Sequence, residues 1–249
     1  MSMTRKIISL FSGAGGMDIG FHKAGFETAV AVEQDPSCCA TLRRNMPNVN
    51  VMEGDITQIS TTEILKAGKM KPLEPSLVIG RPPCQSFSLA GKRMGMDDPR
   101  GKLILEYIRV VREALPVAFV MENVRGMATW SSGKALDAIL NEASREIIYD
   151  DKVYKYDLSY KILNAVDYGV PQFRERIIII GNRIGKKFNF PIPTHTSPSE
   201  AQMDLFKTNE NRWATVWDAI GNLPPAEETS ETALRVSGTI KERIINHGY

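Results

Sequence analysis

Short apolar runs alternate with longer amphipathic segments from residue 6 to about residue 183. The apolar runs predict strands, because each is bounded by turn-forming residues; they cover residues 6–11, 28–33, 48–56, 76–80, 117–124, 158–165 and 176–183. Helical spacing of apolar positions occurs at residues 12–25, 34–46, 100–115 and 133–147. Strands that alternate with helices are typical of βαβ units. The pattern therefore predicts an α/β fold with a mostly parallel, doubly wound sheet.

The alternation stops near Phe190. Residues 190–200 and 223–232 are rich in proline and polar side chains, which favour irregular backbone. We therefore expect one domain over residues 1–186 and an extended, partly irregular tail over residues 187–249.

The composition is that of a globular protein without membrane-spanning segments. The 249 residues are 43% hydrophobic and 24% charged, as in an ordinary globular protein. The net charge of +2 neither requires nor excludes a nucleic-acid partner. No apolar run reaches membrane-spanning length and the N-terminus lacks a signal-peptide core, so we expect a cytoplasmic protein without membrane contact.

The cysteines and histidines do not form a metal-binding or disulfide pattern. Two of the three cysteines, Cys38 and Cys39, are adjacent, and the three histidines are scattered. Such spacing favours a reducing compartment and predicts neither a disulfide framework nor a metal site.

Glycine and acidic residues follow the first three predicted strands. Gly13, Gly15 and Gly16 come after the first, Glu33 ends the second, and Asp55 lies at the end of the third. In such sheets ligands bind beyond the carboxyl ends of the strands, and a glycine loop there suits NAD, FAD or S-adenosylmethionine. The glycines could equally serve close packing, and either acid could cap a helix. Together the three features favour a cofactor that contains adenosine.

A single cysteine follows the fourth predicted strand. Pro82 and Pro83 fix their own φ angles and restrict the residues before them, so they present Cys84 rigidly. A lone cysteine is often a small buried hydrophobic residue. In this proline frame, next to a cofactor loop, Cys84 is predicted to be a nucleophile.

An acidic residue and two arginines mark the remaining strand ends. Glu122 lies near the end of the fifth predicted strand and could donate a proton, or form a salt bridge with a nearby arginine. Arg174 and Arg176 are two residues apart just before an isoleucine run, so at strand spacing they share one face. Such a pair suits a carbonyl, carboxylate or phosphate group.

The chain resembles the cytosine carbon-5 DNA methyltransferases in four ordered motifs, "LFSGAGGMDIGF", "PPCQSFS", "MENV" and "YGVPQFRERIIIIG". The resemblance covers Lys6 to Asn182. It implies the Rossmann-like fold of S-adenosylmethionine-dependent methyltransferases and methylation of carbon 5 of cytosine, as in restriction-modification systems. The partner implied is double-stranded DNA with the target cytosine flipped out of the helix.

The resemblance also implies roles for individual residues. Cys84 would attack carbon 6 of cytosine, Glu122 would protonate ring nitrogen 3, and Arg176, with Arg174 beside it, would contact the base. The residues implied to bind S-adenosylmethionine are Phe11, Gly13, Ala14, Gly15, Gly16, Glu33 (ribose), Asp55 and Ile56 (adenine), Pro82 and Leu103.

Two departures from the family pattern stand out. Arg81 replaces the small or apolar residue that usually precedes the proline pair. The family normally continues into a target-recognition domain and two last catalytic motifs, which nothing after Asn182 resembles. We therefore expect a second polypeptide that supplies them, with a fragment of a longer enzyme as the alternative. The sequence is also compatible with a tRNA cytosine carbon-5 methyltransferase or with a non-catalytic scaffold subunit of the same fold.

Overall fold

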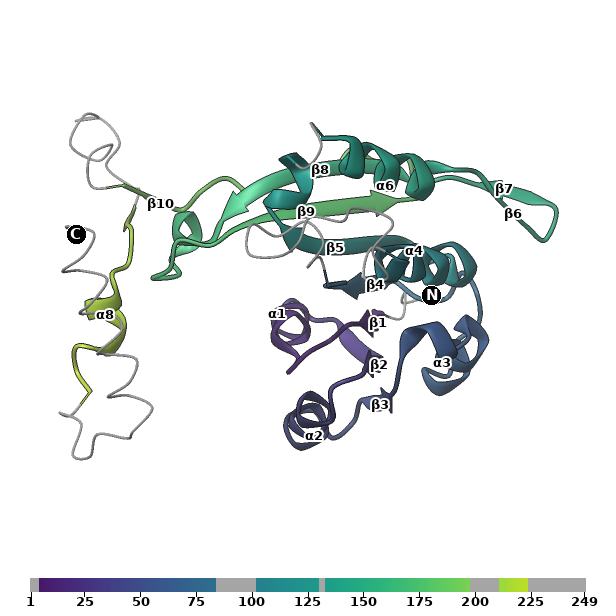
Figure 1. Cartoon of the computed structure of the whole chain (residues 1–249), viewed down its shortest axis with the longest axis horizontal. Coiled ribbons are helices and arrows are strands. Elements are labelled where there is room, and N and C mark those ends of the chain that lie inside the picture. Colours follow the sequence, from purple (N-terminus) through teal and green to yellow (C-terminus); the bar gives the residue numbers. More distant parts are fainter. Residues whose placement is uncertain (1–4, 84–101, 130–132, 198–210, 224–249) are drawn as a thin grey trace.

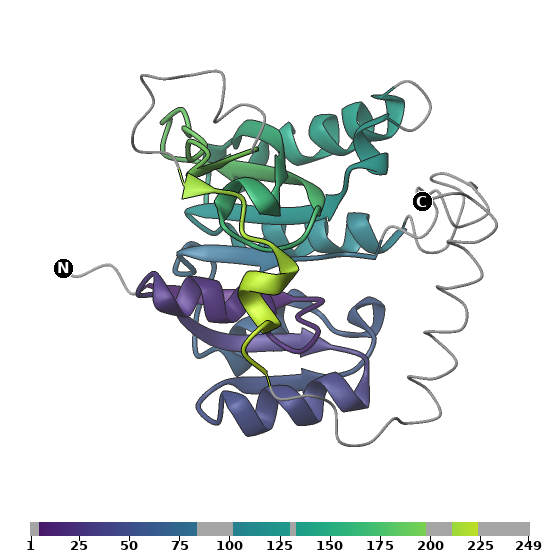
Figure 2. The ribbon, with the colours of Figure 1, turned by 90° about the vertical axis from the view of Figure 1, so that its left-hand side faces the viewer.

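The computed structural model describes residues 5–83, 102–129, 133–197 and 211–223. A seven-stranded sheet in the order β3-β2-β1-β4-β5-β9-β8 forms its centre (Figure 1). Its strands are β1 (Lys6–Leu10), β2 (Glu27–Glu33), β3 (Asn50–Glu53), β4 (Leu77–Gly80), β5 (Ala118–Val124), β8 (Asp157–Asn164) and β9 (Glu175–Asn182). Strands β1 to β5 are parallel, whereas β9 is antiparallel to both β5 and β8. The predicted mostly parallel α/β sheet is confirmed. Figure 2 shows the strands stacked, with the early part of the chain (purple and blue) in the lower half.

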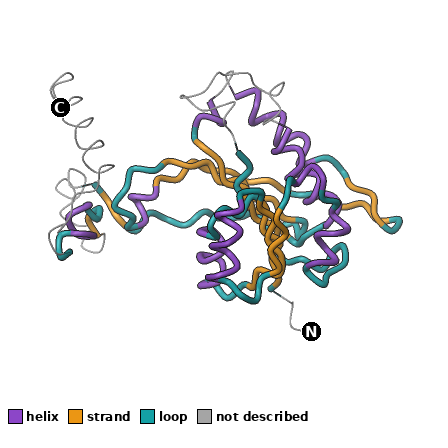
Figure 3. Tube along the Cα trace, turned by 60° about the horizontal axis from the view of Figure 1, so that its bottom comes forward, coloured by secondary structure: helices purple, strands orange, loops and turns teal. Residues whose placement is uncertain are grey.

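Helices lie on both sides of this sheet, as the tube view shows with the strands nearly edge on (Figure 3). They are α1 (Gly16–Lys23), α2 (Pro36–Asn45), α3 (Thr61–Ala67), α4 (Lys102–Ala114), α5 (Gly126–Thr129) and α6 (Lys134–Ser144), with the 3-10 turns η1 (Ile56–Gln58) and η5 (Ala165–Tyr168). Helix α4 contacts both α3 and α6. Six of its side chains, spaced at helical intervals, are buried, which follows from its amphipathic sequence.

Several short elements were not predicted from the apolar pattern, among them α3, α5 and a hairpin. Helix α3 has seven residues, too few for a clear periodicity, and begins at a capping box formed by Ser60 and Glu63. The hairpin of β6 (Ile147–Tyr149) and β7 (Lys152–Tyr154) occupies the end of the segment expected to be helical up to residue 147.

Helix α1 is anchored to the sheet by a buried carboxylate. Ser9 of β1 and Thr28 of β2 donate hydrogen bonds to Asp18 of α1 at 3.0 and 2.9 Å. Burial raises the pKa of the Asp18 carboxyl, and the hydrogen bonds from Thr28 and Ser9 oppose that rise. The three side chains fix α1, and with it the glycine loop that precedes α1, against two central strands.

The two faces of the later strands differ in burial. On the face opposite α1, Met121 of β5 and Ile179 of β9 are each 1% exposed. On the face that carries Ser9 and α1, Val120 and Ile178 of the same strands are only partly buried. Central strands of a doubly wound sheet are normally covered on both faces. In the described part of the chain, this region of the sheet is therefore incompletely covered.

Tyr107 of α4 links strands β4 and β5. Its hydroxyl lies 3.0 Å from the carbonyl oxygens of both Val78 and Val120, so the donated proton is shared between the two strands. The ring packs directly over Gly80, where a Cβ atom would lie 2.7 Å from the ring and 2.8 Å from the carbonyl oxygen of Leu10. Glycine is thus required at the carboxyl end of β4.

The described part of the tail contains only small elements. These are β10 (His195–Thr196), β11 (Asn211–Arg212) and α8 (Val216–Ile220), which lie apart from the main sheet past one end of β8 and β9 (Figure 1). Trp213 donates from Nε1 to Asp167 Oδ1 at 3.1 Å and so ties this region to η5. The domain boundary at residue 186 stays a prediction. Within the described ranges, no helix is long and apolar enough to cross a bilayer.

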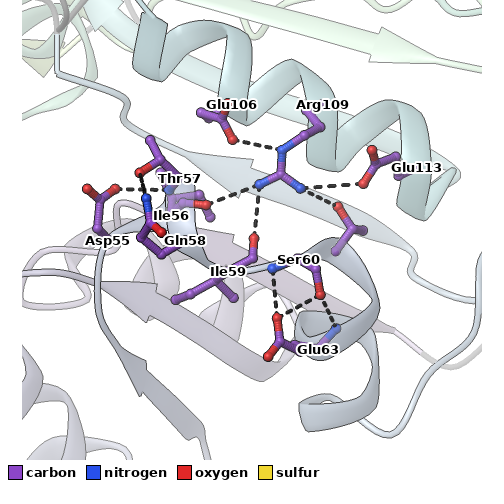
Figure 4. A network of polar contacts seen from close by, with 11 residues as sticks. Asp55, Ile56, Thr57, Gln58, Ile59, Ser60, Glu63, Glu106, Arg109 and Glu113 are labelled. Carbon is purple, nitrogen blue, oxygen red and sulfur yellow. Dashed lines mark hydrogen bonds and ion pairs between the residues drawn. The ribbon is translucent and has the colours of Figure 1, made fainter.

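A single arginine joins α4 to the loop after β3 (Figure 4). Arg109 donates from Nη2 to the carbonyl oxygens of Ile56 and Ile59 at 3.1 and 3.0 Å, and from Nη1 to Thr61 Oγ1 at 3.0 Å. Its Nε pairs with Glu106 at 2.7 Å. The guanidinium therefore satisfies two carbonyl groups of a loop that has little regular structure of its own.

Replacing Arg109 tests this link. We expect Arg109→Ala to lower the free energy of unfolding by about 2 kcal/mol, because two carbonyl groups lose a charged donor. Arg145→Ala is the matched control: Arg145 directly follows α6, is 68% exposed and pairs with Glu142 of that helix, so about 0.5 kcal/mol or less should be lost. Urea unfolding of both variants measures the difference, and equal losses would show that the Arg109 contacts do not stabilise the fold.

Candidate active site

A cavity of about 440 Å3 opens at the carboxyl ends of the parallel strands. Eight of the residues predicted to form the site line it, and they come from six strand ends and from helix α4: Phe11, Gly13, Glu33, Ile56, Pro82, Leu103, Glu122 and Arg176. The sequence analysis assigned no role to Val32, Gln34, Gly54, Asn123 and Val124, which also line it. It named Pro83, another lining residue, only as part of the proline frame of Cys84. Arg81, flagged only as a departure from the family pattern, lines it as well.

Glu33 organises one end of the cavity. Its Oε2 accepts a hydrogen bond from the backbone N–H of Gly13 at 2.6 Å, and its Oε1 accepts from Gln34 and Asp35 at 2.8 and 2.9 Å. The carboxylate thus joins the end of β2 to the glycine loop after β1. A carboxylate has about four acceptor positions, so one remains for a ligand hydroxyl.

The glycine loop owes its shape to residues with positive φ. Phe11 has φ 51° and Gly13 has φ 54°, and both line the cavity. A left-handed backbone at a phenylalanine is uncommon and is often found at ligand-binding sites. No sequence pattern signals the conformation of Phe11.

The other loop residues lie outside the cavity wall. Ala14, Gly15 and Gly16 do not line it. A Cβ atom at Gly15 would lie 2.9 Å from Leu42 and 3.0 Å from Met46, so this glycine allows α1 to pack closely on α2. Gly15 therefore serves close packing of the helices, whereas Gly13 faces the cavity.

Asp55 also differs from Glu33. Its side chain accepts from the backbone N–H of Thr57 at 2.9 Å and caps η1. Asp55 does not line the cavity, whereas its neighbour Ile56 does. In the structure, Asp55 therefore acts as a helix cap. A contact between Asp55 and the adenine of a cofactor stays a prediction.

At the other end of the cavity, one carboxylate lies between two arginines. Glu122 Oε1 is 3.0 Å from Arg176 Nε, and Glu122 Oε2 is 3.5 Å from Arg81 Nε. The side chain of Glu122 is 13% exposed, that of Arg176 25% and that of Arg81 41%. Glu122 therefore forms salt bridges with nearby arginines, and its carboxylate still faces the cavity.

Strand direction explains why Arg176 lies at the start of β9 and still reaches the cavity. Because β9 is antiparallel to β5, Arg176 near the start of β9 pairs with Val124 at the carboxyl end of β5. Arg174 comes one residue before β9 and does not line the cavity. Its backbone N–H donates to Asn164 Oδ1 at 2.9 Å. Burial and the neighbouring charge of Arg176 lower the pKa of Arg174, so the two guanidinium groups affect one another.

Cys84 and its surroundings up to residue 101 lie outside the described residues. The chain leading to it is fixed, however, because Asn123 Nδ2 donates to the carbonyl oxygen of Pro82 at 3.1 Å. Asn123 is 3% exposed, and its position at the end of β5 and its place in the "MENV" motif were the signals in the sequence that could have found it. The carbonyl group before Pro83 is thus held against the strand that carries Glu122.

The two ends of the cavity offer different chemistry. The Phe11, Ile56 and Leu103 side chains give an apolar wall beside the acceptor oxygens of Glu33, which suits the adenine and ribose of an adenosine cofactor. The Glu122 and Arg176 pair can bind a planar group that carries both donors and acceptors. Among the described residues, no three His, Cys, Asp or Glu side chains are grouped to hold a metal ion.

Comparison with known proteins gives the family. Residues 5–247 match the C-5 cytosine-specific DNA methylase family. The chain is 68% identical over 248 residues to the Type II methyltransferase M.AquIA of a Picosynechococcus strain, which it matches over 99% of its own length and 100% of that protein. It is 41% identical to the Type II methyltransferase M1.HphI of Haemophilus parahaemolyticus, over 90% of this chain and 54% of that protein.

Solved structures agree on the fold. A putative DNA modification methyltransferase from an E. coli prophage is 28% identical, with a TM-score of 0.68 over 90% of this chain and 57% of that one. The S. pombe Dnmt2 methyltransferase has a TM-score of 0.60 over 94% of this chain and 65% of that one. Its identity of 18% makes it a comparison of fold alone.

The contrast between Glu33 and its neighbour Glu53 yields a test. The two residues pair in register on β2 and β3, yet only Glu33 lines the cavity. We expect Glu33→Gln to weaken binding of S-adenosylmethionine about tenfold, because the amide places a donor where backbone N–H groups need acceptors. Glu53→Gln should bind as the unmodified chain does. Calorimetry with the cofactor measures both, and unchanged binding by Glu33→Gln would remove Glu33 from the cofactor site.

Proposed function

This chain belongs to the C-5 cytosine-specific DNA methylase family, and on that premise we propose that it methylates carbon 5 of cytosine in DNA through a covalent bond to Cys84. The observation that carries the proposal is the Glu122–Arg176 pair, 3.0 Å apart, in the same cavity as Pro82 and Pro83. These prolines immediately precede Cys84 in the sequence, which supports a thiol close to the acid and the cation.

Direct methylation of cytosine is slow because carbon 5 of the aromatic ring is a poor nucleophile. Addition of the Cys84 thiolate to carbon 6, with a proton delivered to nitrogen 3 by Glu122, would turn carbon 5 into an enamine carbon. Arg176 would hold the ring oxygen at position 2. After methyl transfer, loss of the proton from carbon 5 and expulsion of the thiolate would restore the aromatic ring and the free enzyme.

The cofactor of the family is S-adenosylmethionine, which supplies the methyl group when bound. The residues present fit it: Glu33 retains an acceptor position for a ribose hydroxyl, and Phe11, Ile56 and Leu103 form an apolar wall for adenine. A base inside duplex DNA cannot reach such a cavity, so the target cytosine would have to be flipped out.

Two competing functions are less well supported. A tRNA methyltransferase would share the chemistry, but the relatives at 68% and 41% identity are both named Type II methyltransferases. The Dnmt2 structures are 24% and 18% identical and therefore bear on the fold alone. A non-catalytic scaffold would have no need of the paired Glu122 and Arg176 in a cavity.

We also propose that a second polypeptide completes the enzyme by supplying target recognition and the last catalytic motifs. The chain spans about half of M1.HphI, and Val120 and Ile178 are incompletely covered on the α1 face of the sheet. The partly exposed Val120 and Ile178 support a partner that packs on this face of the sheet. The match to M.AquIA covers that protein in full and does not by itself call for a partner.

Covalent trapping tests the nucleophile. An oligonucleotide with 5-fluorocytosine at the target should form a denaturation-resistant adduct, because fluorine cannot leave carbon 5 as a proton does. Cys84→Ala should abolish the adduct and methyl transfer while cofactor binding persists. Cys38→Ala is the matched control, since Cys38 does not line the cavity. An adduct that survives in Cys84→Ala would exclude Cys84 as the nucleophile.

Complementation tests the second polypeptide. We expect the 249-residue chain alone to bind DNA weakly, with steep salt dependence and little sequence preference. A polypeptide that carries the remaining family motifs should restore site-specific methylation of a plasmid and strengthen cofactor binding. Site-specific methylation by the lone chain at the rate of the pair would show that nothing essential is missing.

A further inference from the structure

We propose that Arg81 binds the α-carboxylate of S-adenosylmethionine, and that it does so by exchanging the carboxylate of Glu122 for that of the cofactor. No role for Arg81 follows from the family pattern, where a small or apolar residue usually stands. The proposal that Arg81 binds the cofactor depends only on S-adenosylmethionine being the cofactor of the family. The effect on Glu122 rests on the proposed function, methylation of cytosine.

Strand register places Arg81 between the two ends of the cavity. Gly80 pairs with Leu10 of β1 on one side and with Met121 of β5 on the other. Arg81, the next residue, therefore lies between Phe11 of the glycine loop and Glu122. The same strand alternation puts Arg81 on the face opposite the Tyr107 ring, which covers Gly80.

Because S-adenosylmethionine is elongated, its methionine part is the part that would lie next to Arg81. The apolar wall and Glu33, which suit adenosine, come from the ends of β1, β2 and β3 and from α4. From there the cavity continues only past the ends of β4, β5 and β9, so the methionine part must extend toward them. Its α-carboxylate then needs a cationic or hydrogen-bonding partner, since a partly buried charge without one is costly.

Two cations line this end of the cavity in the described residues, and they differ in how firmly they are held. Arg176 pairs with Glu122 at 3.0 Å, and its Nη1 also donates to the carbonyl oxygen of Glu175 at 2.7 Å. Arg81 pairs with Glu122 at 3.5 Å and is 41% exposed. Of the two, Arg81 has the longer ion pair and the more exposed side chain, so it is the one that can turn to a new carboxylate.

The exchange has a consequence for the base-binding end. When Arg81 turns to the cofactor, Glu122 Oε2 loses its partner, whereas Oε1 remains paired with Arg176. The released oxygen then faces the cavity, where a cytosine ring would bind. Cofactor binding would thus prepare Glu122 for the base.

Decarboxylated S-adenosylmethionine tests the proposal, because it differs from the cofactor only in lacking the α-carboxylate. We expect the unmodified chain to bind this analogue about tenfold to a hundredfold more weakly than S-adenosylmethionine, the range for a lost charged hydrogen bond. In Arg81→Ala the two ligands should bind almost equally, and Arg81→Lys should lie between. Arg145→Ala removes the same charge from an exposed pair at the end of α6, and this variant should prefer S-adenosylmethionine over the analogue as strongly as the unmodified chain does.

Calorimetry without DNA gives these ratios, with the full chain and, where cofactor binding requires it, the second polypeptide. Unchanged discrimination in Arg81→Ala would overturn the proposal. So would a loss confined to DNA binding, seen as a smaller salt dependence, because Arg81 would then contact a DNA phosphate. These outcomes do not depend on methyl transfer, so failure of the proposed reaction would appear separately, as a complex that binds cofactor but modifies no cytosine.

Discussion

The ion pair between Glu122 and Arg176 is the interaction on which the site depends. It requires β9 to run antiparallel to β5, because only then does the start of one strand meet the carboxyl end of the other. A sheet that remained parallel throughout would put Arg176 at the opposite edge from the cofactor loop. The reversed direction of β9 therefore brings a second cation, besides Arg81, to the edge that carries the acidic groups Glu33 and Glu122.

The remainder of the fold holds the two ends of the cavity at a fixed separation. Tyr107 joins β4 to β5 beneath Arg81, and Arg109 of the same helix holds the carbonyl group of Ile56 at the adenosine end. Helix α4 thus supports both ends from one face of the sheet. On the other face, Asp18 anchors α1 and the glycine loop. A cofactor that spans the cavity would contact groups held by two independent sets of buried bonds.

The apolar pattern predicted the seven strands of the main sheet and the edge where the site forms. The clearest runs are β1 and β4, because burial on both faces leaves a continuous apolar sequence. The pattern missed α3, which is too short to be periodic, and the β6–β7 hairpin, whose turn residues Asp150 and Asp151 have positive φ. The site was predictable where chemistry follows a strand, as at Glu33 and Glu122. The capping role of Asp55, the packing role of Gly15 and the pairing of Arg81 with Glu122 depend on tertiary contacts, which no local pattern reveals.

The central claim is that this cavity methylates carbon 5 of cytosine in DNA. Nucleoside mass spectrometry tests it most directly, on plasmid DNA and tRNA from a host without cytosine methylation that expresses the chain, alone or with the second polypeptide that we propose. We expect 5-methylcytosine in the plasmid, and none above background in the tRNA or when Cys84 is replaced by alanine. A methyl group on the exocyclic nitrogen of cytosine or on adenine, or 5-methylcytosine in tRNA alone, would contradict the claim.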